Sequence, residues 1–228
     1  MIELTILMPC LNEAETLAAC IEKAKGFLAR TGIEGEVLIS DNGSTDDTLA
    51  VLRATYGDDP RVRILHQEHG GVSRARNLGI DHAAGRYLTF LDSDDLWVPD
   101  ALERLVACFD REPSLGLAYG GWDVIDAAGR PNGRVYISTW EGDVWEQFVI
   151  RNPVPASAVA VPRAVLVDLG GFAVNRDRFP IDVEDWELWV RIAAGHRVAV
   201  VSDVLVHHRL HDRNSSSDVA SLEAAYRH

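Results

Sequence analysis

Carboxylate side chains are the first feature of this sequence that points to chemistry. Asp92, Asp94 and Asp95 directly follow a short apolar run, Tyr87 to Leu91. Mg²⁺ and Mn²⁺ prefer carboxylate oxygens, and Mg²⁺ is commonly held by one or two carboxylates together with substrate phosphates. The segment therefore suits a divalent metal, although its carboxylates could instead cap the next helix. Pro99 weighs against a cap, because a proline in the first helical turn places the helix start several residues later.

A second acidic position, Asp41, follows the strand-like run Glu36 to Ser40. Its carboxylate could accept a hydrogen bond from a base N–H or a ribose hydroxyl. It could equally be a turn residue beside Asn42-Gly43, a common turn pair. Ser44 is explained more simply, as the cap of a helix that begins in the capping-box pattern Ser44 to Asp47.

A pair of acidic residues, Glu184 and Asp185, opens a predicted helix that also carries Trp186 and Trp189. Acidic residues in a first turn stabilise a helix through its dipole by a few tenths up to about 1 kcal/mol. Asp185 could instead be a general base facing an acceptor hydroxyl. Residue spacing leaves both readings open.

A basic group lies near the end of the chain: His207, His208, Arg209 and His211. Neutral histidine is a common metal ligand, and arginine suits bidentate contact with phosphate. We expect His207 and His208 to finish a strand. His211 begins a Ser-rich loop and is the better ligand candidate.

The first half of the chain must supply the elements that position these residues. Strand-like runs alternate with helical patterns; one helix, for example, repeats apolar residues at Leu17, Ile21, Ala24 and Leu28. The predicted strands are 4–8, 36–40, 61–66 and 87–91, and the predicted helices include 72–84 and one ending near 110. Four strand–helix units imply a parallel sheet with helices on both faces, whose ligands bind beyond the carboxyl ends of the strands.

The second half is less regular. It predicts strands over 115–126, 134–138 and 198–206 and a helix over 182–194. No linker, repeat or low-complexity segment separates the halves. We therefore predict one domain over residues 1–228, with a nucleotide-binding half up to about 112 and a smaller acceptor-side half over 113–228.

Composition narrows the function classes. The 228 residues suffice for a full hydrophobic core, and a net charge of −13 argues against nucleic-acid binding, which needs a basic surface. An acidic protein must neutralise an anionic ligand locally, with a metal, helix N-termini or a few arginines. Three scattered cysteines, no signal-peptide pattern and no apolar run of about 20 residues predict a reducing, cytoplasmic setting without a membrane span. Peripheral association with the inner face of a membrane stays open.

Taken in order, the motifs resemble the family 2 glycosyltransferases, an inverting group with the GT-A fold. The matching segments span residues 4 to 216: Ile6-Leu7-Met8-Pro9 with Asn12-Glu13, Asp41 to Thr48, Gly70-Gly71-Val72-Ser73 with Ala75 to Gly79, Phe90 to Asp95, Gly170-Gly171-Phe172, Glu184-Asp185-Trp186 with Leu188-Trp189, and Arg209 with His211. Each motif alone is weak. Their common order and plausible spacing make the resemblance specific.

The resemblance implies a role for each residue. The donor-binding set would be Pro9, Leu11, Glu13, Asp41, Gly71, Asp92, Ser93 and Arg209. Asp92, Asp94 and His211 would hold Mn²⁺ or Mg²⁺ on the donor diphosphate, with His211 and Arg209 closing over it. Asp185 would be the catalytic base. The implied partners are a nucleotide-sugar donor and a glycan or lipid-linked acceptor.

Two positions depart from the family pattern, and other functions compete. Leu11 stands where many members carry an aromatic residue near the base, and His69 stands where asparagine is common, so His69 receives no donor contact. A nucleotidyltransferase would show a Gly-rich, basic segment after the first strand, where this chain has Pro9 to Glu13. A catalytically silent sugar-nucleotide or glycan-binding domain is disfavoured by the intact carboxylates. A polyprenyl-phosphate sugar synthase is the nearest rival within the family.

Overall fold

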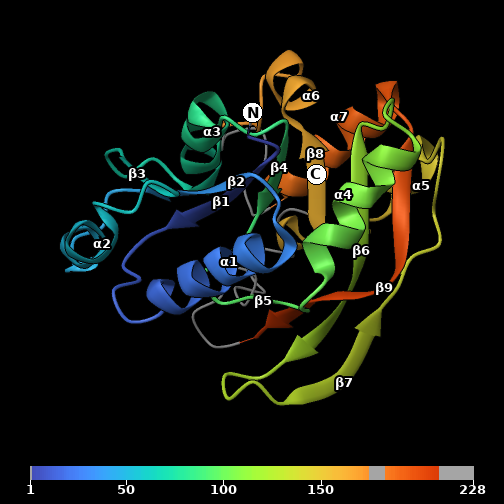
Figure 1. Cartoon of the computed structure of the whole chain (residues 1–228). Coiled ribbons are helices and arrows are strands. Elements are labelled where there is room, and N and C mark those ends of the chain that lie inside the picture. The colour runs from blue at the N-terminus through green and yellow to red at the C-terminus, as the bar shows by residue number, and fades with distance from the viewer. Residues whose placement is uncertain (1, 175–182, 211–228) are drawn as a thin grey trace.

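The computed structural model describes residues 2–174 and 183–210. Figure 1 shows the elements in chain order. The first half contains β1 (Leu4–Cys10), α1 (Leu17–Thr31), β2 (Gly35–Asp41), α2 (Thr48–Tyr56), β3 (Val62–His66), α3 (Val72–His82), β4 (Tyr87–Phe90), β5 (Leu96–Trp97) and α4 (Ala101–Arg111). The second contains β6 (Leu117–Ile125), β7 (Pro131–Tyr136), α5 (Trp145–Ile150), the 3₁₀ turn η1 (Ala156–Ala158), β8 (Val159–Pro162), α6 (Arg163–Asp168), α7 (Glu184–Gly195) and β9 (Val198–Arg209).

One continuous sheet runs through both halves of the described chain. Its strand order is β3-β2-β1-β4-β8-β6-β9-β5, with β7 paired to β6 beside this path. β3, β2, β1 and β4 are parallel, β8 is antiparallel to both of its neighbours, and β6 and β9 are parallel. The predicted parallel sheet is therefore present in the first half, and the second half makes the whole sheet mixed. The division of the domain near residue 112 stays a prediction.

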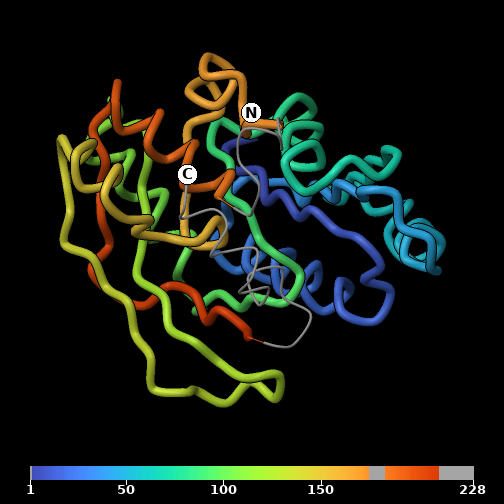
Figure 2. Tube along the Cα trace, turned by 180° about the vertical axis from the view of Figure 1, so that it is seen from behind, coloured from blue at the N-terminus to red at the C-terminus, as the bar shows by residue number. Residues whose placement is uncertain are grey.

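Helices cover both faces of this sheet. α1 and α4 lie in front of it in Figure 1, and α3, α6 and α7 lie behind, as the reverse view in Figure 2 shows. The four apolar residues predicted to form one face of α1 are all buried, which confirms that pattern. β1, β2 and β4 are buried along nearly their whole length, as expected of strands covered on both sides, whereas the edge strand β3 is only partly buried.

β1 extends past Pro9, where the predicted strand ends. In the parallel register, Leu7 is the last β1 residue opposite β4, whereas Pro9 and Cys10 still pair with β2. The Leu91 amide donates to the Leu7 carbonyl and the Asn42 amide to that of Cys10, so Leu7 and Pro9 face β4 and Cys10 faces β2. The missing N–H of Pro9 thus points beyond the end of β4, where no strand partner is lost.

The predicted capping box of α2 is wrong. The helix begins at Thr48, and the Ser44 hydroxyl donates to the Asp41 carboxylate instead of capping it. Asp46 instead bonds the first amide of the helix, since its Oδ1 accepts a hydrogen bond from the Thr48 N–H at 3.0 Å. A buried carboxylate next to the turn outcompetes the helix end for the serine hydroxyl.

Other boundaries shift by a few residues. α4 begins at Ala101, after Pro99, and β7 covers Pro131–Tyr136 in place of 134–138. β9 continues to Arg209, so His207 and His208 do finish a strand as predicted. Within residues 2–174 and 183–210, no helix is long and apolar enough to cross a bilayer.

Candidate active site

A large cleft of about 1530 Å³ opens beyond the carboxyl ends of β1 and β4. It is bordered by the loop after β1, the start of α3, the turn after β4 and the start of α7. Its walls bring together most of the residues predicted for the site: Pro9, Leu11, Glu13, Gly71, Asp92, Ser93, Asp94, Asp185 and Arg209. Asp41 does not line it, and His211 lies outside the described residues.

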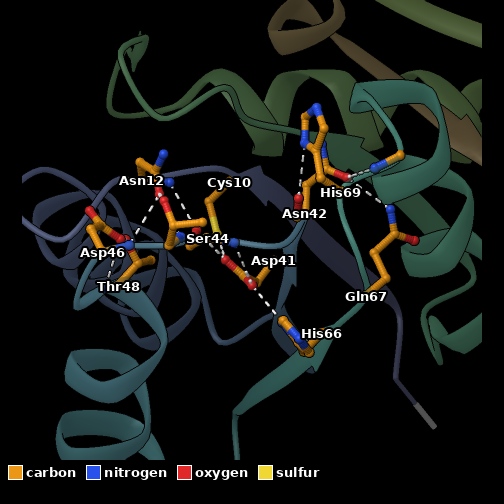
Figure 3. Close-up of polar contacts among 12 residues, drawn as sticks. Cys10, Asn12, Asp41, Asn42, Ser44, Asp46, Thr48, His66, Gln67 and His69 are labelled. Atoms are coloured by element: carbon orange, nitrogen blue, oxygen red, sulfur yellow. Dashed lines mark hydrogen bonds and ion pairs between the residues drawn. The ribbon is translucent and has the colours of Figure 1, made fainter.

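Asp41 is fully buried at the end of β2, and Figure 3 shows its polar contacts. Its carboxylate accepts hydrogen bonds from the Ser44 hydroxyl and amide and from His66 Nδ1, the last at 2.7 Å. Burial alone would raise the pKa of Asp41, but the bonds from Ser44 and His66 outweigh it and lower the pKa. The carboxylate is therefore ionised and already engaged, and its contact with a base or ribose stays a prediction.

The loop after β1 is tied to the loop after β2 through Asn12. The Asn12 amide donates to the Ser44 hydroxyl at 2.8 Å (Figure 3). The side-chain oxygen of Asn12 accepts from the Thr45 amide, also at 2.8 Å. Asn12 has a φ of 59°, the one positive value among the described non-glycine residues. Asparagine tolerates this left-handed conformation better than most residues. These bonds hold Leu11, which is 39% exposed, at the rim of the cleft.

Asn42 organises the opposite rim. Its side-chain oxygen accepts hydrogen bonds from Gln67 Nε2 at 2.9 Å and from the Gly70 amide at 3.0 Å. His69 Nδ1 lies 3.2 Å from the Asn42 carbonyl, and since a carbonyl only accepts, Nδ1 carries the proton (Figure 3). Gly71 has a φ of 92° and directly precedes α3. His69, which received no donor contact from the sequence, thus lines the cleft beside Gly71.

The turn after β4 gives its three carboxylates different surroundings. Asp92 lies in the cleft wall, with its side chain 35% exposed. Asp94 also lines the cleft, and the Cys20 thiol donates to the carbonyl of Ser93 between them at 3.2 Å. Asp95 is buried and accepts from His208 Nδ1 at 3.0 Å and the Arg209 amide at 3.1 Å. Asp95 therefore fastens the turn to β9, while the other two carboxylates face the cleft.

Asp185 also lines the cleft, in the first turn of α7. Its Oδ1 accepts from the Trp186 amide and, at 3.4 Å, from the side chain of Asn152. Oδ2 receives no hydrogen bond from the described residues. Burial, reinforced by the charge of Glu184 and opposed by that of Arg76, raises the pKa of Asp185 to about 7. A carboxylate that titrates near neutral pH in a cleft has the properties of a general base.

The two tryptophans of α7 have structural contacts. Trp189 is fully buried and meets Phe172 edge to face, with ring centroids 6.1 Å apart. Trp186 donates its indole N–H to the Phe148 carbonyl of α5. Both anchor α7, and with it Asp185: Trp189 to the segment that carries Phe172, and Trp186 to α5.

Arg209 is engaged with the backbone. Its Nε donates to the Asp94 carbonyl at 2.9 Å, and its Nη1 donates to the Asp126 carbonyl at 3.0 Å. The guanidinium thus joins the turn after β4 to the β6–β7 hairpin while it lines the cleft. Phosphate contact by Arg209 stays a prediction and would add to these bonds or exchange with them.

The cleft is acidic where an anionic ligand would bind. Within the part of the chain that the structure describes, its lining carries six acidic side chains, Glu13, Glu15, Asp92, Asp94, Glu184 and Asp185, against three basic ones, Lys23, Arg76 and Arg209. Among the described residues no three His, Cys, Asp or Glu side chains form a ready metal cage. Two cleft carboxylates nevertheless fit the way Mg²⁺ is held when substrate phosphates complete its shell. Asp92 and Asp94 are the residues that would hold it.

Arg76 is a site residue to which sequence reasoning gave no role. It extends from α3, is 4% exposed, and pairs with Asp92 at 2.9 Å and with Glu184 at 2.7 Å. Its only signal in the sequence was its place within the Ala75 to Gly79 motif. A lone arginine on a predicted helix is usually exposed, and its partners lie 16 and 108 residues away along the chain.

A family model decides the classification of the chain. The model described as "Glycosyl transferase family 2" matches residues 5–173. The chain belongs to this family. The resemblance read from the motifs is confirmed at that level, and the matched region includes every predicted site residue except Asp185, Arg209 and His211.

Curated relatives agree on the class. The chain is 38% identical over 115 residues to "Chondroitin synthase" of Pasteurella multocida (strain Pm70), covering 50% of this chain and 12% of that protein. It is 31% identical over 206 residues to an "Uncharacterized glycosyltransferase" of Rickettsia conorii, covering 89% of this chain and 32% of that protein. This family 2 chain thus spans at most about a third of the length of these relatives.

Solved structures share the fold. A mannosyltransferase from Pyrobaculum calidifontis, in complex with GDP-Man and Mn²⁺, matches with a TM-score of 0.71 and 20% identity over 98% of this chain and 61% of that one. S. aureus TarS 1-349, in complex with UDP-GlcNAc, matches with a TM-score of 0.70 and 18% identity over 95% of this chain and 61% of that one. At this identity the likeness concerns the fold, and it confirms the predicted GT-A-type α/β architecture.

Proposed function

We propose that this family 2 glycosyltransferase inverts configuration as it moves a sugar from a nucleotide-diphosphate sugar to an acceptor hydroxyl. The observation that carries the proposal is the cleft, which Asp92 and Asp94 of the turn after β4 line together with Asp185 of α7. The fold neighbours that hold GDP-Man with Mn²⁺ and UDP-GlcNAc support a donor of this kind. We further propose a glycan or lipid-linked acceptor. Cytoplasmic location and peripheral membrane contact remain predictions from the sequence.

Asp185 supplies the base of this reaction. Its Oδ1 is held by the Trp186 amide, which leaves Oδ2 to take the proton of the acceptor hydroxyl. The acceptor oxygen then bonds to the anomeric carbon while the bond from that carbon to the diphosphate oxygen breaks, and the electron pair leaves with the diphosphate. One displacement inverts the configuration, so no covalent enzyme intermediate is needed. General-base assistance of this kind contributes about 10²–10⁴-fold to a rate.

A divalent cation would allow an anionic diphosphate to bind beside the acidic lining. An anionic diphosphate would be repelled by Asp92 and Asp94, which are the residues that would hold Mn²⁺ or Mg²⁺. When bound, the cation supplies the positive charge that stabilises the leaving diphosphate. Pro9 and Glu13 would line the pocket for the base and ribose, and Leu11 and Ser93 would border it.

A screen of nucleotide sugars tests the proposal. Purified protein is incubated with UDP- and GDP-sugars, with Mn²⁺ or with chelator, and release of nucleoside diphosphate is measured. We expect at least one donor to be turned over only with the metal. Asp185→Asn should lower turnover about 10²–10⁴-fold and leave binding of that donor, measured by calorimetry, nearly unchanged.

Each other outcome changes the proposal in a defined way. If no donor is bound or turned over, the transferase function is refuted for this chain. Metal-dependent binding without turnover, in the presence of glycan and polyprenyl-phosphate acceptors, would leave a donor-binding domain. A large loss of donor binding in Asp185→Asn would remove Asp185 from the base role.

A further inference from the structure

The guanidinium of Arg76 joins the two walls of the cleft. Its Nη2 donates to Asp92 Oδ1 at 2.9 Å, and its Nη1 donates to Glu184 Oε1 at 2.7 Å. Asp92 lies in the turn after β4. Glu184 is the first residue of α7 and directly precedes Asp185. One side chain from α3 therefore contacts both the wall predicted to bind the donor and the wall that carries the base.

The surroundings of Arg76 fix its position. The residue is 4% exposed, and its guanidinium carbon lies 5.2 Å from the centroid of the Phe172 ring. Burial alone would lower the pKa of Arg76, but the charges of Asp92 and Glu184 raise it. Its Nε is buried without a hydrogen-bond partner among the described residues, so the two Nη groups make its polar contacts. A planar guanidinium held in this way sets the relative position of the two carboxylates that it bonds, Asp92 and Glu184.

The ring of Phe172 is itself held in place. Its backbone amide donates to Asn77 Oδ1 at 2.8 Å, and its carbonyl accepts from Asn77 Nδ2 at 2.9 Å. Asn77 follows Arg76 directly on α3, so the same turn of that helix carries the guanidinium and holds the backbone of the residue whose ring it contacts. A Cβ on Gly171 would collide with the Asn77 side chain, which shows how closely this joint is packed.

We propose that Arg76 is a positioning residue that couples donor and cation binding at Asp92 to the placement of Glu184 and Asp185. The inference rests on the proposed function. A cation bound at Asp92 competes with the Arg76 guanidinium for the negative charge of that carboxylate, and so weakens the pairing of Arg76 with Asp92. The pairing of Arg76 with Glu184 then strengthens. The first turn of α7 is then held more firmly when the donor is present. Arg76 touches neither acceptor nor leaving group in this scheme.

The test compares Arg76→Lys with a matched control on α7. Lysine keeps the charge but lacks the fork that bonds both carboxylates at once. Arg191→Lys is the control, because Arg191 pairs with Glu187 at 2.7 Å and with the Gly171 carbonyl but contacts neither Asp92 nor Glu184. Both variants replace a partly or fully buried arginine, so a general effect on stability appears in both.

Hydrogen exchange supplies a readout other than activity. UDP or GDP with Mn²⁺, whichever calorimetry shows the wild type to bind, should slow exchange in the turn after β4 and in residues 183–190. In Arg76→Lys we expect the protection of 183–190 to be lost while that of the turn persists. Arg191→Lys should keep both. Equal protection of 183–190 in Arg76→Lys and wild type would overturn the inference.

Kinetics test the same link through the base. Misplacing a reacting group by about 1 Å can cost about 10²-fold in rate, and we expect kcat for donor turnover to fall on that order in Arg76→Lys with little change in KM. In the Asp185→Asn background the same substitution should cost almost nothing, because no base remains to be placed. An equal fold loss in both backgrounds would overturn the coupling. If Arg76→Lys does not fold, Glu184→Gln removes the other end of the link and should give the same pattern.

The two proposals fail differently. A wild-type protein that binds no nucleotide with Mn²⁺ and releases none refutes the proposed function, and the inference falls with it. A wild type that binds and turns over a donor, beside an Arg76→Lys variant that matches it in exchange and in kcat, refutes the coupling alone.

Discussion

Replacing Asp185 with asparagine should stabilise the ligand-free protein, although it removes the proposed base. The folded-state pKa of Asp185 is raised to about 7 from an ordinary value of 3.8. A raised carboxyl pKa means that the protonated form favours folding. Its contribution to the free energy of unfolding is therefore complete below about pH 4 and is lost as the pH rises through about 7. Asparagine resembles the protonated form at every pH.

The size of the effect follows from the shift. Three pKa units correspond to an upper limit of about 4 kcal/mol at pH 8, falling to about 2 kcal/mol near pH 5. Asp185 is half-buried in an open cleft, so solvent screening should roughly halve these values. We expect Asp185→Asn to raise the free energy of unfolding by about 2 kcal/mol near pH 8 and by about 1 kcal/mol near pH 5.

Urea unfolding with chelator present, followed by tryptophan fluorescence at several pH values, measures this difference. Asp110→Asn, at an exposed position on α4, is the matched control and should change stability by less than about 0.5 kcal/mol at every pH. A gain for Asp185→Asn that is absent, or that does not grow with pH, would refute the reasoning. Asp185 would then lie in a water-like environment and would be a poor general base at neutral pH.

Three further predictions concern the rest of the site and its support. Asp94→Ala should weaken Mn²⁺-dependent nucleotide binding at least 10-fold in calorimetry, with binding in chelator unchanged; equal metal-dependent binding would remove Asp94 from the cation site. Asn12→Ala should lower the free energy of unfolding by about 1–2 kcal/mol in urea titrations and weaken nucleotide binding, because it cuts the bond to the Thr45 amide and leaves alanine at positive φ. Gly85→Ala should destabilise the fold by about 1–3 kcal/mol, since its Cβ would collide with the backbone of Thr5, whereas Gly26→Ala in open space on α1 should stabilise it by about 0.5–1 kcal/mol. Similar midpoints for the two glycine variants would show that the contact of Gly85 with β1 can relax.

The sequence was most informative where apolar periodicity was strong. The strand–helix alternation of the first half was predicted because buried parallel strands read as short apolar runs and α1 carries one clear apolar face. β8 was missed although it lies in the middle of the sheet. It is four residues long, Val-Ala-Val-Pro, and follows a stretch of small residues that shows neither helical nor strand period. Its place is set by pairing with β4 and β6, which no local pattern records.

The sequence predicted which residues line the cleft better than it predicted the contacts that those residues make. The carboxyl ends of parallel strands must meet, so the location of Asp92 and Asp94 in one cleft followed from the topology. That Asp41 would be fully buried and bonded to His66 did not, because its partner lies on the next strand, 25 residues away. The wrong cap at Ser44 has the same origin: the hydroxyl had a local partner in the sequence and a stronger one in the fold.

The segment Asp92 to Asp95 shows why motif and role separate. Three carboxylates within four residues meet three environments: Asp92 pairs with Arg76 from α3, Asp94 lines the cleft, and Asp95 is buried against His208 of β9. The like charges of the three would oppose one another if all faced the same ligand. Because His208 and the backbone of β9 hold one of them inside the protein, the turn offers two carboxylates to the cleft, within the one or two that Mg²⁺ commonly uses when substrate phosphates complete its shell. The motif is local in sequence, but the environment of each carboxylate depends on α3, which precedes the motif, and on β9, which follows it by more than 100 residues.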